Sequence, residues 1–272
     1  MIRKMYSSSH QDAPGHTHRR DKEVQRIETF SDAVFGFAVT LLIVSLEVPK
    51  NFEELLINIR GFFAFGISFF LLVFIWVEQH RYFRKYGMDD GWTLVLNMIL
   101  LFIVLFYVYP LKYLFTLMFS DEIYGKGRSP FEISSHQVPV LMEIYAVGFI
   151  AIYGLLFLMY YRTVKNAKVM GLTRMEIFDC RSTMFKLLIM ELTGIFSLIL
   201  AYTLPENHVG LAGYAYTLMA PAIFIYFSYR VKIRKKYFLK WLTDKEYRQK
   251  KINESLKPPV DFPISGANSI QA

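Results

Sequence analysis

The sequence has one cysteine, Cys180, so no disulfide can form within the chain. It lacks runs of about ten alternating apolar and polar residues, the pattern of membrane barrel strands. It also lacks a nucleophile with a nearby base, a histidine-rich metal cluster inside an apolar segment, and a phosphate-binding glycine loop. These absences exclude a disulfide scaffold and argue against a barrel or an enzyme.

Long apolar runs are what the sequence does contain, since 54% of its residues are hydrophobic and 17% are aromatic. A helix needs about 20 mostly apolar residues to cross a bilayer. We therefore predict an all-α membrane protein with six transmembrane helices, at residues 29–48, 57–79, 92–118, 138–161, 183–204 and 210–230.

The basic residues predict the orientation of the chain. Most Lys and Arg residues lie in the N-terminal leader, the second and fourth connections and the C-terminal tail. Because cytoplasmic connections carry the excess of basic residues, both termini are predicted to be cytoplasmic. The net charge of +8 is then explained by topology and by contact with anionic lipid headgroups, and no nucleic-acid-binding module is present.

Three regions are expected along the chain. Residues 1–25 are polar and predict a disordered cytoplasmic leader, residues 26–231 form the membrane domain, and residues 232–272 form a basic cytoplasmic tail, disordered at its end. The basic and aromatic start of the tail suits either a helix on lipid headgroups or a solvated helix in a subunit contact. A weak metal site at the leader histidines is the minor alternative to disorder, so no metal or cofactor is expected.

Polar residues cluster where the first three predicted helices meet the cytoplasmic side. Arg26, Ser31 and Asp32 stand at the start of the first helix, where a carboxylate entering lipid needs a partner. His80 ends the second helix and Asn97 lies near the start of the third, at the same membrane depth. We expect these five side chains to form one hydrogen-bonded network.

Two further acids have simpler interpretations. Glu28 lies in the first turn of the first helix, where the helix dipole favours an acid. Glu191 lies inside the fifth predicted helix, and we expect a neutral acid or one paired with Lys186 or Arg230; a proton relay is the alternative.

These polar residues carry a resemblance to a known family. Arg26, Phe30, Ser31 and Asp32, followed by apolar residues to Leu42, resemble the signature of the transmembrane protein 175 family of lysosomal-type potassium channels and their prokaryotic relatives. The ending of the second helix and the start of the third are similar to the same family, through Trp76, His80, Arg81 and Asn97. The resemblance covers about residues 26–110.

The resemblance implies a potassium channel whose first helices surround a central pore, without the Thr-Val-Gly-Tyr-Gly filter of other potassium channels. A single copy of the signature implies a homotetramer, with potassium as the permeant ion, no enzymatic activity and proton permeability as an option. The signature residues would have a structural role that orients the pore face. A single copy also favours a bacterial plasma membrane, with an endosomal or lysosomal membrane as the alternative for a eukaryotic chain.

Helical spacing selects the face of the first helix that would line such a pore. Phe37, Leu41, Val44 and Val48 share one face, with Thr40 and Glu47 on its flank. Without the family signature, such an apolar stripe on a membrane helix more often faces lipid or neighbouring helices than a pore. The family implies the narrowest apolar ring at Phe37, where other members have Ile or Leu, a polar ring at Thr40 and a second apolar ring at Val44. Glu47 would concentrate cations at the outer mouth.

A secondary transporter for a small ion or solute is the alternative function. It predicts related halves and helices broken near the membrane midplane. No clear internal repeat is present in the sequence. A membrane enzyme is the weaker alternative.

Overall fold

The structure is a computed structural model, and it describes residues 26–44, 49–88, 90–126, 130, 133–172, 174–205 and 208–243. These residues form helices and connections and no strand. The leader, Glu47, Val48 and the tail after residue 243 lie outside the described residues, so the expectations for them stay predictions. The fold class is confirmed as all-α.

Six long helices form the bundle. They are α1 (Arg26–Val44), α2 (Phe52–Tyr86), α3 (Gly91–Met118), α5 (Val138–Lys165), α6 (Arg174–Thr203) and α8 (Met219–Thr243). The short elements are α4 (Ser120–Tyr124), η2 (Ser135–Gln137), α7 (Leu211–Tyr214) and η4 (Ala215–Leu218).

Five segments are long and apolar enough to cross a membrane: α2, α3, α5, α6 and the segment Leu211–Arg234. Helix α1 is not among these five within the described residues. It has 19 residues, and Arg26, Glu28 and Asp32 occupy its first turns. The crossing by α1, and with it the total of six spans, therefore remains a prediction.

Helix α2 is longer at both ends than the predicted segment 57–79. Its N-cap Asn51 accepts a hydrogen bond from the Glu54 backbone N–H at 2.8 Å, which satisfies one of the free donors of the first turn. At the other end Gly87 adopts a left-handed conformation (φ 55°), and its N–H donates to the Phe83 carbonyl. These two caps allow 35 helical residues, about 52 Å at 1.5 Å each, so α2 extends beyond a hydrocarbon core of about 30 Å.

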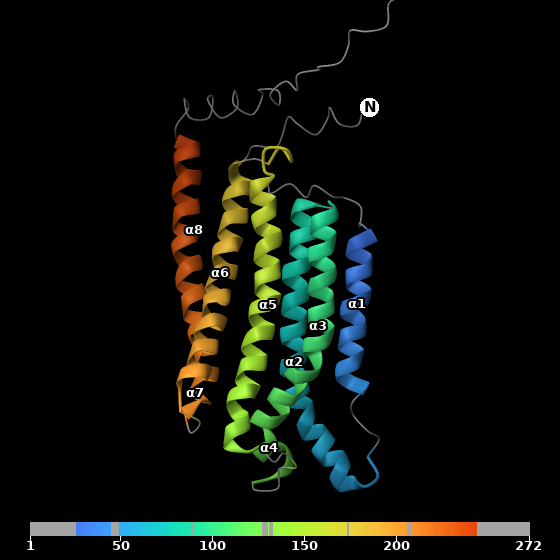
Figure 1. The fold of residues 1–272 in the computed structure, drawn as a ribbon. Helices are drawn as coiled ribbons and strands as arrows, with labels where there is room; N and C mark the ends of the chain where they lie inside the picture. The colour runs from blue at the N-terminus through green and yellow to red at the C-terminus, as the bar shows by residue number, and fades with distance from the viewer. Residues whose placement is uncertain are drawn as a thin grey trace, which may run out of the picture.

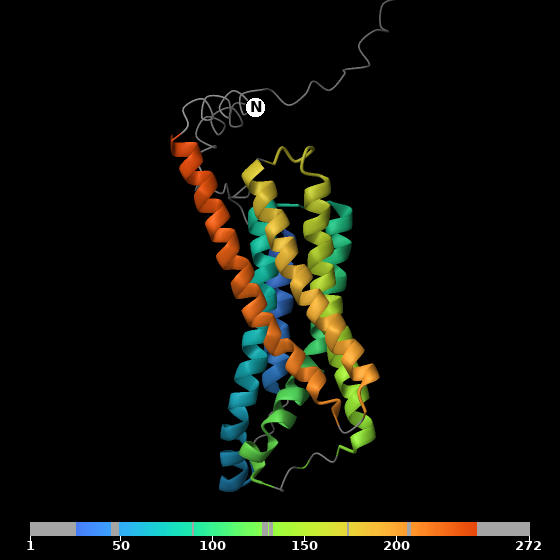
Figure 2. The ribbon, with the colours of Figure 1, turned by 90° about the vertical axis from the view of Figure 1, so that its left-hand side faces the viewer.

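The long helices run alternately up and down, so α1 begins and α8 ends at the same end of the bundle (Figure 1). We call this the terminus end; the connections from α2 to α3 and from α5 to α6 also lie there. Helix α1 packs on α2 and α3 at one edge, whereas α8 packs on α6 at the opposite edge. Figure 2 shows α8 crossing the bundle obliquely along α6.

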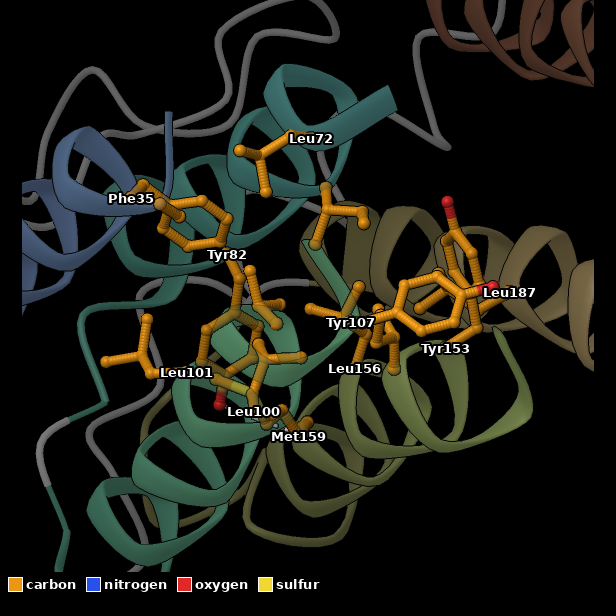
Figure 3. Packing of buried hydrophobic residues seen from close by; sticks show 14 of the residues in the cluster. Phe35, Leu72, Tyr82, Leu100, Leu101, Tyr107, Tyr153, Leu156, Met159 and Leu187 are labelled. Carbon is orange, nitrogen blue, oxygen red and sulfur yellow. Dashed lines mark hydrogen bonds between the residues drawn. The ribbon is translucent and has the colours of Figure 1, made fainter. Parts of the chain in front are cut away.

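The interior is filled by side chains from α1, α2, α3, α5 and α6 (Figure 3). Tyr82 of α2 is fully buried, and its hydroxyl lies 3.1 Å from the Thr163 hydroxyl and donates to the Met159 carbonyl at 3.3 Å. Around this ring lie Leu100 of α3 and Leu156 of α5, both fully buried. This contact joins the first three helices to the last three at the terminus end.

A glycine allows α3 and α5 to approach closely. A Cβ on Gly148 would lie 2.2 Å from the Tyr107 ring, so only glycine fits there. The Tyr107 hydroxyl donates to the Tyr145 carbonyl at 2.9 Å, and the Tyr145 hydroxyl donates to the Pro110 carbonyl at 2.8 Å. These bonds satisfy the two tyrosine hydroxyl groups, which the close approach of α3 and α5 buries.

The expected sixth helix, residues 210–230, differs in detail. It begins as the short elements α7 and η4 and becomes α8 only at Met219. Helix α8 then continues to Thr243, which makes the start of the predicted tail helical. Large apolar side chains of α8 are exposed, among them Phe224 and Ile225, as expected for contact with lipid or another subunit.

Candidate functional site

Helix α1 has two distinct faces. Its inner face packs on α2 and α3 through Ile27, Ser31, Phe35, Ala38 and Leu42, which are all buried and spaced three or four residues apart. Its outer face carries the exposed residues Thr29, Phe30, Ala33, Gly36, Phe37, Thr40, Leu41 and Ile43.

The predicted pore residues lie on this outer face. Phe37 is 57% exposed, Leu41 is 39% exposed, and Thr40 is exposed between them. Val44 is the last residue of α1, and its side chain is not described; Glu47 lies outside the described residues. The structure therefore presents Phe37, Thr40 and Leu41 to whatever lies beside α1.

The Thr40 hydroxyl has a defined orientation. It donates to the Phe37 backbone carbonyl at 2.7 Å. Because its single proton is used in this bond, the lone pairs of the oxygen remain as acceptors. A ring of such oxygens could coordinate a cation through their lone pairs. It could not donate hydrogen bonds to an anion.

Three fully buried side chains join α1, α2 and α3. The Asn97 amide donates to the Ser31 hydroxyl oxygen at 2.9 Å, and the Gln79 amide donates to the Asn97 carbonyl oxygen at 2.8 Å. Ser31 in turn donates to the Ile27 backbone carbonyl at 2.7 Å. Sequence reasoning brought Ser31 and Asn97 together by depth but missed Gln79, which stands next to His80 in the chain.

A second contact ties α1 to α2. The indole N–H of Trp76 donates to the Asp32 carboxylate at 2.7 Å, and the Trp76 ring lies 5.2 Å from the His80 ring between centroids. Hydrogen bonds to a carboxylate are stronger than neutral ones and set the rotation of the helix that carries them. Asp32 therefore fixes α1 against α2.

Glu28 forms the third contact. Its carboxylate is 3% exposed, with one oxygen 3.2 Å from His80 Nδ1 and 3.6 Å from Arg84 Nε. Neither contact has hydrogen-bond alignment, because both nitrogens lack a hydrogen-bond partner. Glu28 is therefore held by charge at the mouth of α1, which differs from the ordinary N-terminal acid expected from the sequence.

The single expected network is thus three separate contacts. Arg26 is exposed and has no hydrogen bond or ion pair among the described residues, and Phe30 is exposed on the outer face. The contacts of Ser31, Asp32 and Glu28 orient α1 without Arg26.

The opposite face of α2 is joined to α6 by ion pairs. Glu78 is 2% exposed; its carboxylate lies 2.5 Å from Lys186 Nζ and 3.5 Å from Arg81. About two helical turns along α2, Lys85 lies 3.0 Å from Asp179, and Asp179 also binds Arg230 of α8 at 2.7 Å. Lys186 and Arg230 are therefore occupied by other acids, so the expected pairing of Glu191 with either of them is wrong.

A further ion pair joins the connection between α2 and α3 to helix α5. Asp90 lies 2.6 Å from Arg162 of α5 and accepts a hydrogen bond from the Thr93 hydroxyl. Burial raises the pKa of Asp90, but the Thr93 and Arg162 hydrogen bonds and the Arg162 charge outweigh it and hold that pKa below its usual range. Asp90 thus anchors the start of α3 to the end of α5.

No metal centre emerges from these groups. In the part of the chain that the structure describes, no three His, Cys, Asp or Glu side chains come together. The arrangement provides instead an oriented helix, whose buried inner face is apolar apart from Ser31 and whose exposed outer face carries Thr29 and Thr40 among apolar side chains. That arrangement can line a passage or meet a second copy of the chain.

Known proteins resemble this chain in sequence. Residues 26–107 match the family described as endosomal/lysosomal potassium channel TMEM175. A potassium channel of Marivirga tractuosa is 39% identical over 218 residues, which cover 76% of this chain and 87% of that protein. A potassium channel of Chamaesiphon minutus is 34% identical over 96 residues, which cover 32% of this chain and 47% of that protein.

The fold is also similar to a solved structure. A threonine-to-alanine variant of the potassium channel MtTMEM175, crystallised with a nanobody–MBP fusion protein, has a TM-score of 0.71 at 34% identity. The match covers 80% of this chain and 98% of that chain. The likeness therefore extends well past the signature helices, and this multi-pass membrane protein belongs to the TMEM175 family of ion channels.

Proposed function

We propose that this protein is a potassium-selective channel in which four copies surround a central pore lined by α1. One observation carries the proposal. The inner face of α1 is fixed by Ser31 and Asp32, while Phe37, Thr40 and Leu41 on the outer face are exposed in the single chain. Relatives named potassium channels support the choice of ion.

In this proposal the chain crosses the membrane six times, with α1 as the first span and the terminus end in the cytoplasm. The shared end of α1 and α8 and the distribution of Lys and Arg support this topology. Basic segments at that end would contact anionic lipid headgroups. The bacterial relatives support a bacterial plasma membrane.

The pore would be controlled by two neighbouring rings. Four Phe37 rings form an apolar constriction that closes by excluding water. Four Thr40 oxygens follow, with their protons committed to backbone carbonyls, so they offer acceptors to a partly dehydrated cation. Val44 adds an apolar ring, and Glu47 concentrates cations at the outer mouth.

Substitution of Thr40 tests the selectivity mechanism. Thr40→Ala removes the acceptor ring, so the potassium over sodium permeability ratio should fall in bilayer recordings of purified protein. Thr217→Ala is the matched control, because Thr217 is exposed and makes the same type of bond, to the Tyr214 carbonyl at 2.7 Å, away from α1. Unchanged reversal potentials in Thr40→Ala would contradict the role of Thr40.

Cross-linking between copies tests the assembly. In a Cys180→Ala background, Phe37→Cys should give covalent dimers with a short bifunctional maleimide, because the proposed pore brings the four copies of residue 37 together. Phe102→Cys is the control, since Phe102 is 71% exposed on α3. Light scattering of the uncross-linked protein should give the mass of four chains. A monomeric mass, or equal cross-linking of both variants, would overturn the tetrameric pore.

Recordings under separate potassium, sodium and proton gradients distinguish the channel from its alternatives. Unitary currents with a potassium reversal potential support the proposal. A current driven by a proton gradient alone would add proton permeability to the same pore. Saturable flux of a solute without unitary currents would favour the secondary transporter instead.

A further inference from the structure

Glu191 is an acid in a membrane helix far from the proposed pore. It lies on α6, which packs along α5 on the side of the bundle away from α1. Its side chain is half-buried, and one carboxylate oxygen, Oε2, is buried without a hydrogen-bond partner. An isolated ionised carboxylate in such a place is costly, so its charge must be removed or compensated.

Helix α5 makes room for this carboxylate. A Cβ on Gly154 would lie 3.1 Å from Glu191 Oε1 and 3.3 Å from Oε2, closer than side chains normally approach. The glycine therefore forms a notch in α5 that receives the carboxyl group. Neighbouring core side chains from the same two helices, Tyr153 and Leu187, lie together in Figure 3.

Three basic groups on the packed helices are already paired with other acids. On α6, Lys186 binds Glu78. On α5, Arg162 binds Asp90, and on α8, Arg230 binds Asp179. The Glu191 carboxylate makes no ion pair or hydrogen bond with any residue that the structure describes.

A metal cation does not fit the notch. Such cations need several oxygen ligands, and in the described part of the chain Glu191 belongs to no group of three or more His, Cys, Asp or Glu side chains. A proton needs only the one carboxylate oxygen. A protonated carboxyl group is also neutral, which removes the cost of burial.

We propose that Glu191 in the notch of Gly154 is a protonated carboxylic acid open to the lipid phase and a modification site for hydrophobic carbodiimides. In the reaction the carboxyl proton moves to one nitrogen of the carbodiimide, and the carboxylate oxygen adds to its central carbon. The acyl group then migrates from that oxygen to the neighbouring nitrogen and forms a stable N-acylurea. All reagent atoms are retained, and no oxidant or reductant is needed.

The first test is labelling of the full-length protein in liposomes with dicyclohexylcarbodiimide at neutral pH, read by peptide mass spectrometry. Glu191 should gain the mass of one reagent molecule, and the label should be lost in Glu191→Gln, whose side chain has the same shape. Glu78 should stay unlabelled, because it is buried and paired with Lys186. Absence of a label on Glu191 would overturn the modification site.

The second test does not depend on reagent access. The infrared C=O band of a neutral carboxylic acid should be present in the wild type and lost in Glu191→Gln. Gly154→Ala should shift that band, because the new methyl group displaces the carboxyl, whereas Gly66→Ala should not, since nothing lies within 4 Å of a Cβ there. A carboxylate band in its place would show that Glu191 is ionised and would overturn the proposal. Neither test involves the pore, so either result leaves the proposed channel function to its own experiments.

Discussion

The two faces of α2 hold their neighbours by different interactions. Toward α1 and α3, Trp76 and Gln79 make hydrogen bonds in which at most one partner is charged. Toward α6, Glu78 and Lys85 make ion pairs with Lys186 and Asp179. The two sets of contacts interleave on consecutive turns of the same helix.

This difference predicts unequal responses to substitution. A buried ion pair that loses one partner leaves an uncompensated charge, at a cost of about 3–5 kcal/mol. A hydrogen bond that loses its donor leaves one polar group unpartnered, at about 1–3 kcal/mol. We therefore expect the α2–α6 face to control stability most strongly and the α1 face to control the orientation of the pore helix.

The largest effect is expected for Lys186→Met. The substitution leaves Glu78 buried with only Arg81 at 3.5 Å, so the free energy of unfolding should fall by about 3–5 kcal/mol. Unfolding titrations in detergent measure it. The double variant Glu78→Gln with Lys186→Met should recover much of the loss, because no buried charge remains. Equal losses in the single and double variants would show that the pair contributes nothing beyond packing.

A smaller effect is expected for Trp76→Phe on the other face. Phenylalanine keeps an aromatic ring but removes the N–H that Asp32 accepts at 2.7 Å, so stability should fall by about 1.5–3 kcal/mol. The potassium over sodium permeability ratio should fall as well, because α1 loses a contact that orients Thr40. Trp92→Phe, at an exposed position on α3, should change neither property. A destabilised Trp76→Phe channel with wild-type selectivity would show that the contact between Trp76 and Asp32 stabilises the fold but does not orient the face that lines the pore.

The smallest effect concerns Asp90 and appears only in acid. Its pKa is lower in the folded protein than the value of about 3.9 in the unfolded chain, so its contribution to stability is complete above about pH 4 and is lost as the pH falls through the folded pKa. Asp90→Asn should therefore flatten the acid limb of a plot of melting temperature against pH. Asp121→Asn, at an exposed position on α4, is the control and should leave that limb unchanged. An acid limb as steep in Asp90→Asn as in the wild type would contradict the argument.

Part of the candidate site could be predicted from the sequence because membrane depth follows from residue number. Counting residues from the cytoplasmic side placed Ser31, Asp32 and Asn97 at one level, and the structure brings them into two contacts on α1. The family resemblance was drawn for residues 26–110, and a relative matches the chain over 218 residues. The apolar runs, and the membrane depth that two residues share, can both be read from the sequence without knowing how the helices pack.

The rest could not be predicted, because depth does not give direction around a helix axis. Gln79 and Glu78 are consecutive, yet one faces Asn97 of α3 and the other faces Lys186 of α6. The sequence also suggested Lys186 as a partner of Glu191, since the two lie near each other in α6. Helix packing instead directs Lys186 toward α2, where it pairs with the buried carboxylate of Glu78.

The sequence by itself determined that this protein is a helical membrane protein, because its apolar runs match the thickness of a bilayer, and it determined which polar residues share a depth. The tertiary structure decided which of those residues meet, because side-chain partners depend on how each helix is rotated against its neighbours. It turned the Ser31 side of α1 inward and the Phe37 side outward. It also placed Glu191 in the notch of Gly154, without a hydrogen-bond or ion-pair partner among the residues that the structure describes.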